Sequence, residues 1–341
     1  MAKVTIRDVA KRAGVSTTTV SHVINETRFV EESTRTKVLN AIEGLGYTVN
    51  TAARSLRGGK TQTLGLVIPD AANLFFAEFS RKIEDFGFKA GYNVIVCNTD
   101  NESTKEAAYL EALVSKQVDG VIFISSGGDP DHLRSLADYE IPVVIADREI
   151  PLDLADVVLL DNEQAGFEIT NHLLALDHRL IGCITGPDKF SPSSQRLDGF
   201  YRAHKEWGIP FHPELITSGK FTLSSGYTSF DRIWQQELKA SALFVFSDMM
   251  AIGAINNAFS KGIKIPDDLS VIGFDNIELA SVCLPSLTTY AQPVEAMAET
   301  IVDLMLDRIK NKKTNARKIT FRGSLIIRKS TGVYKELDAN N

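Results

Sequence analysis

The first stretch of the chain carries apolar residues three and four positions apart, the spacing of a helix with one buried face. These residues are Ile6, Val9, Ala10 and Ala13. Thr5 precedes them and Asp8 stands three positions later, a capping-box pattern that starts a helix. Gly14 interrupts the apolar run, so the pattern predicts a short helix between Thr5 and Gly14.

A second helix is predicted directly afterwards, and its two faces differ in chemistry. Ser16 is a favourable N-cap, and Val20, Val23 and Ile24 form an apolar stripe. The outer face carries hydroxyl, imidazole and amide groups without an acid: Thr17, Thr18, Ser21, His22 and Asn25. These groups suit the reading of base edges in a DNA major groove, although Ser and Thr also hydrogen-bond locally. Two helices joined by a tight turn at Gly14 predict a helix-turn-helix.

A third helix completes this predicted N-terminal unit. It begins near Ser33, buries an apolar stripe and ends at Gly46. The stripe consists of Val38, Ile42 and Leu45. In the loop before this helix, Arg28 is followed by Phe29 and Val30, which are predicted as apolar anchors.

A short basic segment, residues 50–60, follows the three helices. Asn50 or Thr51 would cap a helix of about two turns, too short to be stable in water without packing partners. Leu56 stands between Arg54 and Arg57, which is typical of an apolar wedge inserted between base steps in a minor groove. The alternative, a plain interdomain linker, explains the two glycines that follow but not the basic residues around Leu56.

From Thr63 onward, short apolar runs alternate with amphipathic stretches of ten to twenty residues. The runs predict strands at 64–68, 93–97, 120–124, 143–146, 157–160, 181–185, 243–246 and 270–273. Helices are predicted between them, for instance at 77–89, 105–116, 162–176 and 249–260. This alternation predicts parallel sheets covered by helices, and so many strands indicate two Rossmann-like lobes. No Gly-x-Gly-x-x-Gly and no P-loop follow any strand, so we expect no nucleotide cofactor.

Charge is distributed unevenly along the 341 residues. Residues 1–60 contain ten Lys or Arg and five Asp or Glu, a net charge of +5. Because the whole chain carries −6, the remaining residues carry −11. A basic N-terminal unit on an acidic body is expected when only that unit meets DNA phosphates.

Composition and motifs exclude several other classes of protein. The chain is 44% hydrophobic and 23% charged, with no apolar run of membrane length and no signal-peptide pattern. Cys97, Cys183 and Cys283 form neither a metal spacing nor a disulfide pattern, which favours the reducing cytoplasm. No nucleophile–base arrangement, paired acids or metal-binding His spacing is present, so we expect neither catalytic residues nor a metal site.

Polar and aromatic residues recur where the predicted strands end. They are Asn73, Phe75, Phe76, Asp147, Arg148, Arg196, Phe221, Ser247, Asp275 and Gln292. Each one alone has a local explanation; Asp248 reads as an N-cap and Asp275 as a turn residue, while Arg196 opens a predicted helix. Together they predict a ligand site between the lobes, because ligands of open α/β sheets bind at the carboxyl ends of strands. Carboxylates, amides, guanidinium groups and aromatic faces suit a sugar.

The N-terminal unit resembles the DNA-binding head of the LacI/GalR family of repressors. The resemblance is carried by VSTTTVSHVIN at 15–25, TRFV at 27–30 and ARSL at 53–56, and is close to purine- and ribose-responsive members. It implies that Thr17, Thr18 and His22 contact major-groove bases. It also implies that Arg28 assists from the loop and that Leu56 is the minor-groove wedge.

The rest of the chain resembles the periplasmic-binding-protein-like core of the same family. The resemblance implies three crossings between the lobes, near Asp161, Gln292 and Gly323. We therefore expect a DNA-binding domain at 1–48 and a hinge at 49–61. The first lobe is expected at 62–161 and 293–322, and the second at 162–292 and 323–338.

The resemblance also bears on the effector. All the strand-end residues except Ser247 match ligand positions of ribose-binding members, which carry Asn at that position. Arg196, Phe221 and Asp275 match positions of purine-responsive repressors as well. Since Asp147 and Arg148 suit vicinal hydroxyls better than a flat base, we expect a small monosaccharide such as ribose or another pentose, with a purine as the alternative.

These observations predict a cytoplasmic transcriptional repressor controlled by a small molecule. A homodimer is expected, because one head reads only a half-site of operator DNA. The alternatives are an enzyme and a sugar-binding protein that does not bind DNA. The lack of a nucleophile with a base argues against an enzyme, and the N-terminal unit together with the missing signal-peptide pattern argues against a sugar-binding protein that does not bind DNA.

Overall fold

The computed structural model describes residues 4–25, 28–47, 60–124, 130–148, 155–187, 191–311 and 315–335. The chain divides into two compact units, residues 1–61 and 62–341, which are treated separately below. Within the described ranges, no helix is long and apolar enough to cross a membrane.

The first unit contains three helices: α1 (Ile6–Ala13), α2 (Thr17–Asn25) and α3 (Glu32–Leu45). Their apolar stripes meet in one small core, as the period of the sequence predicted. The core is formed by the buried residues Val9, Ala10, Val20, Val23, Val38 and Ala41. This arrangement confirms the all-α N-terminal unit and its helix-turn-helix.

Local hydrogen bonds set where these helices begin and end. The Asp8 carboxylate accepts bonds from the Thr5 backbone N–H (2.8 Å) and hydroxyl (2.7 Å), and the hydroxyl bond lowers the pKa of Asp8. The Ser16 hydroxyl accepts from the Thr19 N–H at 3.0 Å and so caps α2. Gly14, at φ 68°, makes the left-handed turn that ends α1 and lets α2 follow after two residues.

One expectation for this unit is wrong. Phe29 was predicted as an apolar anchor, but 96% of its surface is exposed, whereas Val30 packs partly against the core. An apolar residue in a loop has no helical period to indicate its direction, so sequence pattern could not decide between burial and exposure.

The second unit contains two six-stranded sheets. The first has the order β11-β5-β4-β3-β1-β2, with every pair parallel. Its strands are β1 (Thr63–Ile68), β2 (Asn93–Asn98), β3 (Gly120–Ile124), β4 (Val143–Ala146), β5 (Asp156–Leu160) and β11 (Lys318–Phe321).

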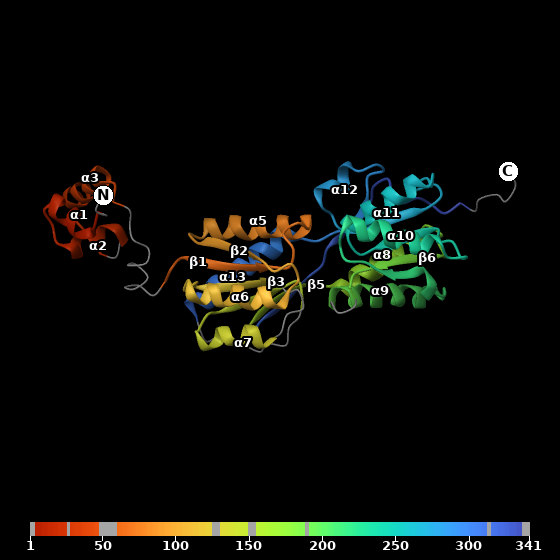
Figure 1. Cartoon of the computed structure of the whole chain (residues 1–341), viewed down its shortest axis with the longest axis horizontal. Helices are drawn as coiled ribbons and strands as arrows, with labels where there is room; N and C mark the ends of the chain where they lie inside the picture. The colour runs from red at the N-terminus through yellow and green to blue at the C-terminus, as the bar shows by residue number, and fades with distance from the viewer. Residues whose placement is uncertain are drawn as a thin grey trace. The chain divides into compact units, whose positions relative to one another are not determined.

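Helices cover both faces of this sheet (Figure 1). Their bounds are α5 (Leu74–Lys89), α6 (Ser103–Ser115), α7 (Pro130–Asp138) and α13 (Val294–Lys310). Alternate strand residues take part in two cores: Ile122 and Ile124 join one with α5 and α13, while Val121 and Phe123 join the other with α6 and α7. Strands buried on both faces read as continuous apolar runs, which is why the sequence predicted them well.

The second sheet has the order β12-β10-β9-β8-β6-β7, parallel except for the antiparallel pair β10–β12. Its strands are β6 (Ile181–Thr185), β7 (Ile216–Ser218), β8 (Ala242–Val245), β9 (Ser270–Asp275), β10 (Thr288–Ala291) and β12 (Ser324–Ile326). The chain passes from the first sheet to the second after β5 and after β11, and returns to the first after β10.

Helices also cover the second sheet, with α9 and α11 on opposite sides (Figure 1). The helices are α8 (Asn162–Ala175), α9 (Ser191–Trp207), α10 (Leu223–Trp234), α11 (Asp248–Ser260) and α12 (Glu278–Val282), and the 3₁₀ turn is η1 (Pro213–Leu215). The prediction of two α/β lobes that follow a helical head in the sequence is therefore confirmed.

The sequence missed four strands, β7, β10, β11 and β12, each of three or four residues. Three of them, β7, β11 and β12, lie at sheet edges, where one side of the strand stays unpaired. Edge strands of this length carry no long apolar run. They become strands because they pair with a neighbouring strand, and the sequence pattern does not show that pairing.

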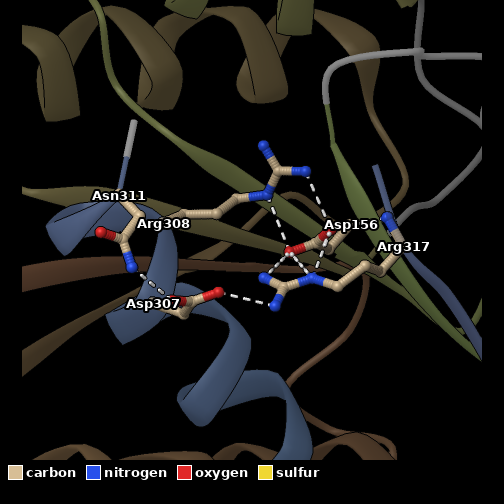
Figure 2. A network of polar contacts seen from close by, with 5 residues as sticks. All are labelled: Asp156, Asp307, Arg308, Asn311 and Arg317. Carbon is tan, nitrogen blue, oxygen red and sulfur yellow. Dashed lines mark hydrogen bonds and ion pairs between the residues drawn. The ribbon is translucent and has the colours of Figure 1, made fainter. Parts of the chain in front are cut away.

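A buried ion cluster joins three segments of the first lobe (Figure 2). Asp156, at the start of β5, is fully buried and accepts hydrogen bonds from Arg308 of α13 (Nε, 2.8 Å) and from the Arg317 guanidinium (Nη2, 2.7 Å) and backbone N–H (2.8 Å). Burial alone would raise the pKa of Asp156, but the hydrogen bonds from the two arginines outweigh it and the pKa is lowered.

Candidate functional site

The first candidate site is the outer face of α2. Thr17 and Thr18 are exposed, Ser21 and His22 are partly exposed, and Arg28 is exposed in the following loop. The core thus holds the apolar stripe of α2 and leaves its hydroxyl and imidazole groups outward. The Asn25 side chain, Arg54 and Leu56 lie outside the described residues.

The second candidate site is a pocket in the second unit. It is lined by Asn73, Phe75, Phe76, Asp147, Arg148, Pro192, Arg196, Phe221, Phe246, Asp275 and Gln292. The structure thereby brings together all the strand-end residues named from the sequence except Ser247. Residues from both lobes contribute, as expected for ligands at the carboxyl ends of parallel strands.

The first lobe supplies an amide and two aromatic rings from the start of α5. The Asn73 side chain accepts a hydrogen bond from the Phe75 N–H at 3.0 Å and so caps α5. The rings of Phe75 and Phe76 meet edge to face, with centroids 5.2 Å apart. The helix start therefore fixes one apolar wall of the pocket.

Asp147 and Arg148 follow β4 and bring a charged pair to the same lobe. Arg148 Nε lies 3.6 Å from Asp147 Oδ2, and both side chains are largely shielded from solvent. Burial lowers the pKa of Arg148, while the neighbouring Asp147 charge opposes this shift. Asp147 also adopts φ 69°, an uncommon backbone conformation for a residue other than glycine.

Arg196 is the central cation of the second lobe. Its Nε donates to Asn162 Oδ1 at 2.9 Å, its Nη1 donates to the Phe246 carbonyl at 2.7 Å, and its guanidinium lies 3.4 Å over the Phe274 ring. Burial lowers the pKa of Arg196 to about 10, so it stays charged at neutral pH. Arg196 was expected to open its helix, but α9 begins at Ser191 and Arg196 lies in its second turn.

Asp275 is the last residue of β9. Gln292 Nε2 donates to Asp275 Oδ1 at 2.8 Å. Burial raises the pKa of Asp275 well above its usual value, although the Arg196 charge acts in the opposite direction. The Asp275 carboxyl group thus lines the pocket and can hydrogen-bond with a ligand.

Ser247 has a structural role in this molecule. Its hydroxyl accepts from the Met250 N–H at 3.3 Å, so Ser247 is the N-cap of α11. The expectation that Asp248 is this N-cap is wrong, because Asp248 is the first residue of the helix itself. Pro192 and Phe246 line the pocket although sequence analysis did not select them. The sequence pattern assigned Phe246 to a predicted strand and gave Pro192 no role, so only the fold shows that both line the pocket.

Two acidic and two basic side chains line the pocket. Its acids are Asp147 and Asp275, and its bases are Arg148 and Arg196. Four phenylalanines, Phe75, Phe76, Phe221 and Phe246, add apolar walls. This lining offers directed hydrogen bonds and aromatic contact to a neutral polar molecule. No group of His, Cys, Asp and Glu that would hold a metal ion occurs among the described residues.

A helix-turn-helix head and a two-lobed core with a polar pocket define a ligand-responsive DNA-binding regulator. Residues 5–50 match the family described as bacterial regulatory proteins, lacI family, and residues 170–331 match a periplasmic binding protein-like domain. The HTH-type transcriptional repressor PurR of Aliivibrio salmonicida (strain LFI1238) is 40% identical over 327 residues, covering 96% of this chain and 98% of that protein. The chain belongs to the lacI family of bacterial regulatory proteins.

Solved structures agree with this assignment. The lac repressor dimer bound to operator and an anti-inducer has a TM-score of 0.86 at 26% identity, covering 97% of this chain and 100% of that one. A LacI family regulator from Enterococcus faecium with bound ribose has a TM-score of 0.74 at 29% identity, covering 80% of this chain and 100% of that one. The chain is a transcriptional repressor, and the prediction of a regulator rather than an enzyme is confirmed.

Proposed function

We propose that this repressor binds a pseudo-palindromic operator as a homodimer and that a neutral small molecule in the pocket controls this binding. The two acidic and two basic side chains that line the pocket carry the effector part of the proposal, because together with the phenyl rings they suit a polar molecule without a strong charge. The lac repressor structure supports the dimer, since that relative is a dimer on its operator. The domain and lobe bounds expected from the sequence remain part of the same proposal.

On the DNA side, we assign base contacts in the major groove to the outer face of α2. Its residues there are Thr17, Thr18, Ser21, His22 and Asn25. Arg28 would add a contact from the loop, because it is exposed next to α2 in sequence. Arg54 and Leu56 are assigned to the hinge, with Leu56 as the minor-groove wedge.

A purine base is the first candidate for the effector. The comparisons favour it over the sugar expected from the sequence, because the PurR relative is a purine-responsive repressor that matches over nearly the whole chain. The site is compatible with this ligand: phenyl rings stack on flat bases, and Asp275 and Arg196 offer an acceptor and donors to its edge.

A monosaccharide is the second candidate, and one observation favours it. Asp147 and Arg148 place a carboxylate and a guanidinium group side by side in the pocket, 3.6 Å apart. Such a pair suits two neighbouring hydroxyl groups, which a purine base does not have. The regulator with bound ribose has a similar fold.

The two candidates separate in one experiment. Purified protein is titrated by calorimetry with hypoxanthine, guanine and D-ribose, and each compound is then added to an operator-binding assay on DNA selected from a random library. Binding of a purine with no response to ribose supports the purine candidate, and the reverse result supports the sugar. Asp147→Ala should abolish the effect of a sugar on DNA binding while effector-free DNA affinity stays close to that of the wild type.

A further inference from the structure

A strained turn presents Asp275 to the pocket. Asp275 and the next residue, Asn276, adopt φ 113° and φ 60°, both in the region that residues other than glycine rarely occupy. Two such residues in succession cost free energy unless surrounding contacts hold them. The contacts that hold this turn therefore control where the Asp275 carboxyl group lies.

The turn is held through its backbone N–H groups. The Ile277 N–H donates to Asp248 Oδ2 at 2.9 Å, and the Asn276 N–H donates to the Thr289 hydroxyl at 3.3 Å. The Thr289 hydroxyl in turn donates to Asp248 Oδ1 at 2.6 Å. Both N–H groups are thus connected, directly or through one hydroxyl, to a single carboxyl group.

Asp248 lies in a space shaped for it. Its side chain is fully buried, and so is that of Thr289. A Cβ atom at Gly273 would collide with Asp248 Oδ1, so glycine at this position of β9 leaves room for the carboxyl group. Arg328 holds the same turn from another side, since its Nη2 donates to Asn276 Oδ1 at 2.7 Å.

We propose that Asp248, acting through Thr289, is a positioning residue for effector binding: it holds the 275–277 turn so that Asp275 meets the effector. Asp248 is not among the residues that line the pocket, so we assign its effect on the effector to the way it holds this turn. The proposal rests on the proposed function of the pocket. It adds a residue outside the pocket that determines how Asp275 meets the effector.

The test compares variants that keep or remove the Thr289 hydroxyl. Thr289→Val has the same shape without the hydroxyl, Thr289→Ser keeps it, and Thr170→Val is a matched control in α8, where an equally buried hydroxyl bonds only to Gly166. The probes are hypoxanthine and D-ribose, measured by calorimetry. We expect Thr289→Val to bind the probe roughly tenfold more weakly, while Thr289→Ser and Thr170→Val bind it as the wild type does.

A double-mutant cycle distinguishes positioning from general destabilisation. In an Asp275→Asn background, Thr289→Val should cause no further loss, because the group it positions has changed; an additive loss overturns the proposal. If Asp275→Asn leaves binding unchanged, the pocket assignment itself fails, and this proposal with it. If Asp275→Asn weakens binding of the probe but Thr289→Val does not, only the positioning role is overturned.

A measurement without ligand gives the same decision if neither probe binds. Amide hydrogen exchange of the peptide that covers residues 275–277 should become faster in Thr289→Val than in Thr289→Ser, because the Asn276 N–H loses its partner and Asp248, which holds the Ile277 N–H, loses the hydroxyl bonded to it. Equal exchange in the two variants overturns the proposal.

Discussion

Removing the Asp156 carboxylate should destabilise the first lobe strongly. In the Asp156→Ala variant, Arg308 loses two hydrogen bonds of 2.8 Å and Arg317 loses its partner at 2.7 Å (Figure 2). Arg308 is itself buried, so its charge would be left without this partner in a medium of low polarity. Breaking a buried ion pair in this way costs about 3–5 kcal/mol, and we expect a loss of that size in the free energy of unfolding.

Urea unfolding of the wild type and the variant at neutral pH measures this loss. Asp307→Ala is the control: it removes the Arg317 partner at 2.6 Å, but both side chains are partly exposed, so the loss should be clearly smaller. Because the pKa of folded Asp156 is lowered, its contribution is complete above the unfolded value of about 3.9 and is lost as pH falls through the folded value. The difference between wild type and Asp156→Ala should therefore shrink below about pH 4. A loss below about 1 kcal/mol at neutral pH would refute the argument that this carboxylate compensates buried charge.

Three further predictions follow from the head, the hinge and the core. His22→Ala or Thr18→Ala should cost roughly 1–3 kcal/mol of operator binding and relax sequence preference; full discrimination between operator and scrambled DNA in gel shifts would contradict the groove assignment. Leu56→Ala should weaken specific binding while salt-sensitive non-specific binding persists, and equal losses in the two assays would mean that Leu56 only packs in the hinge. Burial raises the pKa of Asp248 to about 7, so ionisation disfavours folding. The free energy of unfolding should therefore fall as pH rises from about 4 to about 7. In Asp248→Asn, urea unfolding should show a smaller decrease over the same pH range, because the group that titrates has been removed.

Much of the fold follows from patterns that the sequence carries locally. The capping residues Thr5 and Ser16 and the apolar period of α2 act within one or two helical turns, so neighbouring residues decide them. The central strands are buried on both faces, so each is a continuous apolar run that can be recognised from the sequence alone. Strand ends could be found for the same reason, and with them most residues of the candidate effector pocket.

Only the tertiary structure decided which of these residues meet and what surrounds them. Asp156 joins Arg308 and Arg317 across 152 and 161 positions of sequence, and no local pattern records that pairing. Phe29 is apolar yet exposed, and Pro192 and Phe246 line the pocket without any polar atom to mark them. Asp248 looks like a helix cap in the sequence, yet its carboxyl group bonds to segments that lie 29 and 41 positions away. Periodicity and capping depend on a few neighbouring residues, whereas burial and the partners of buried charges depend on how distant segments pack.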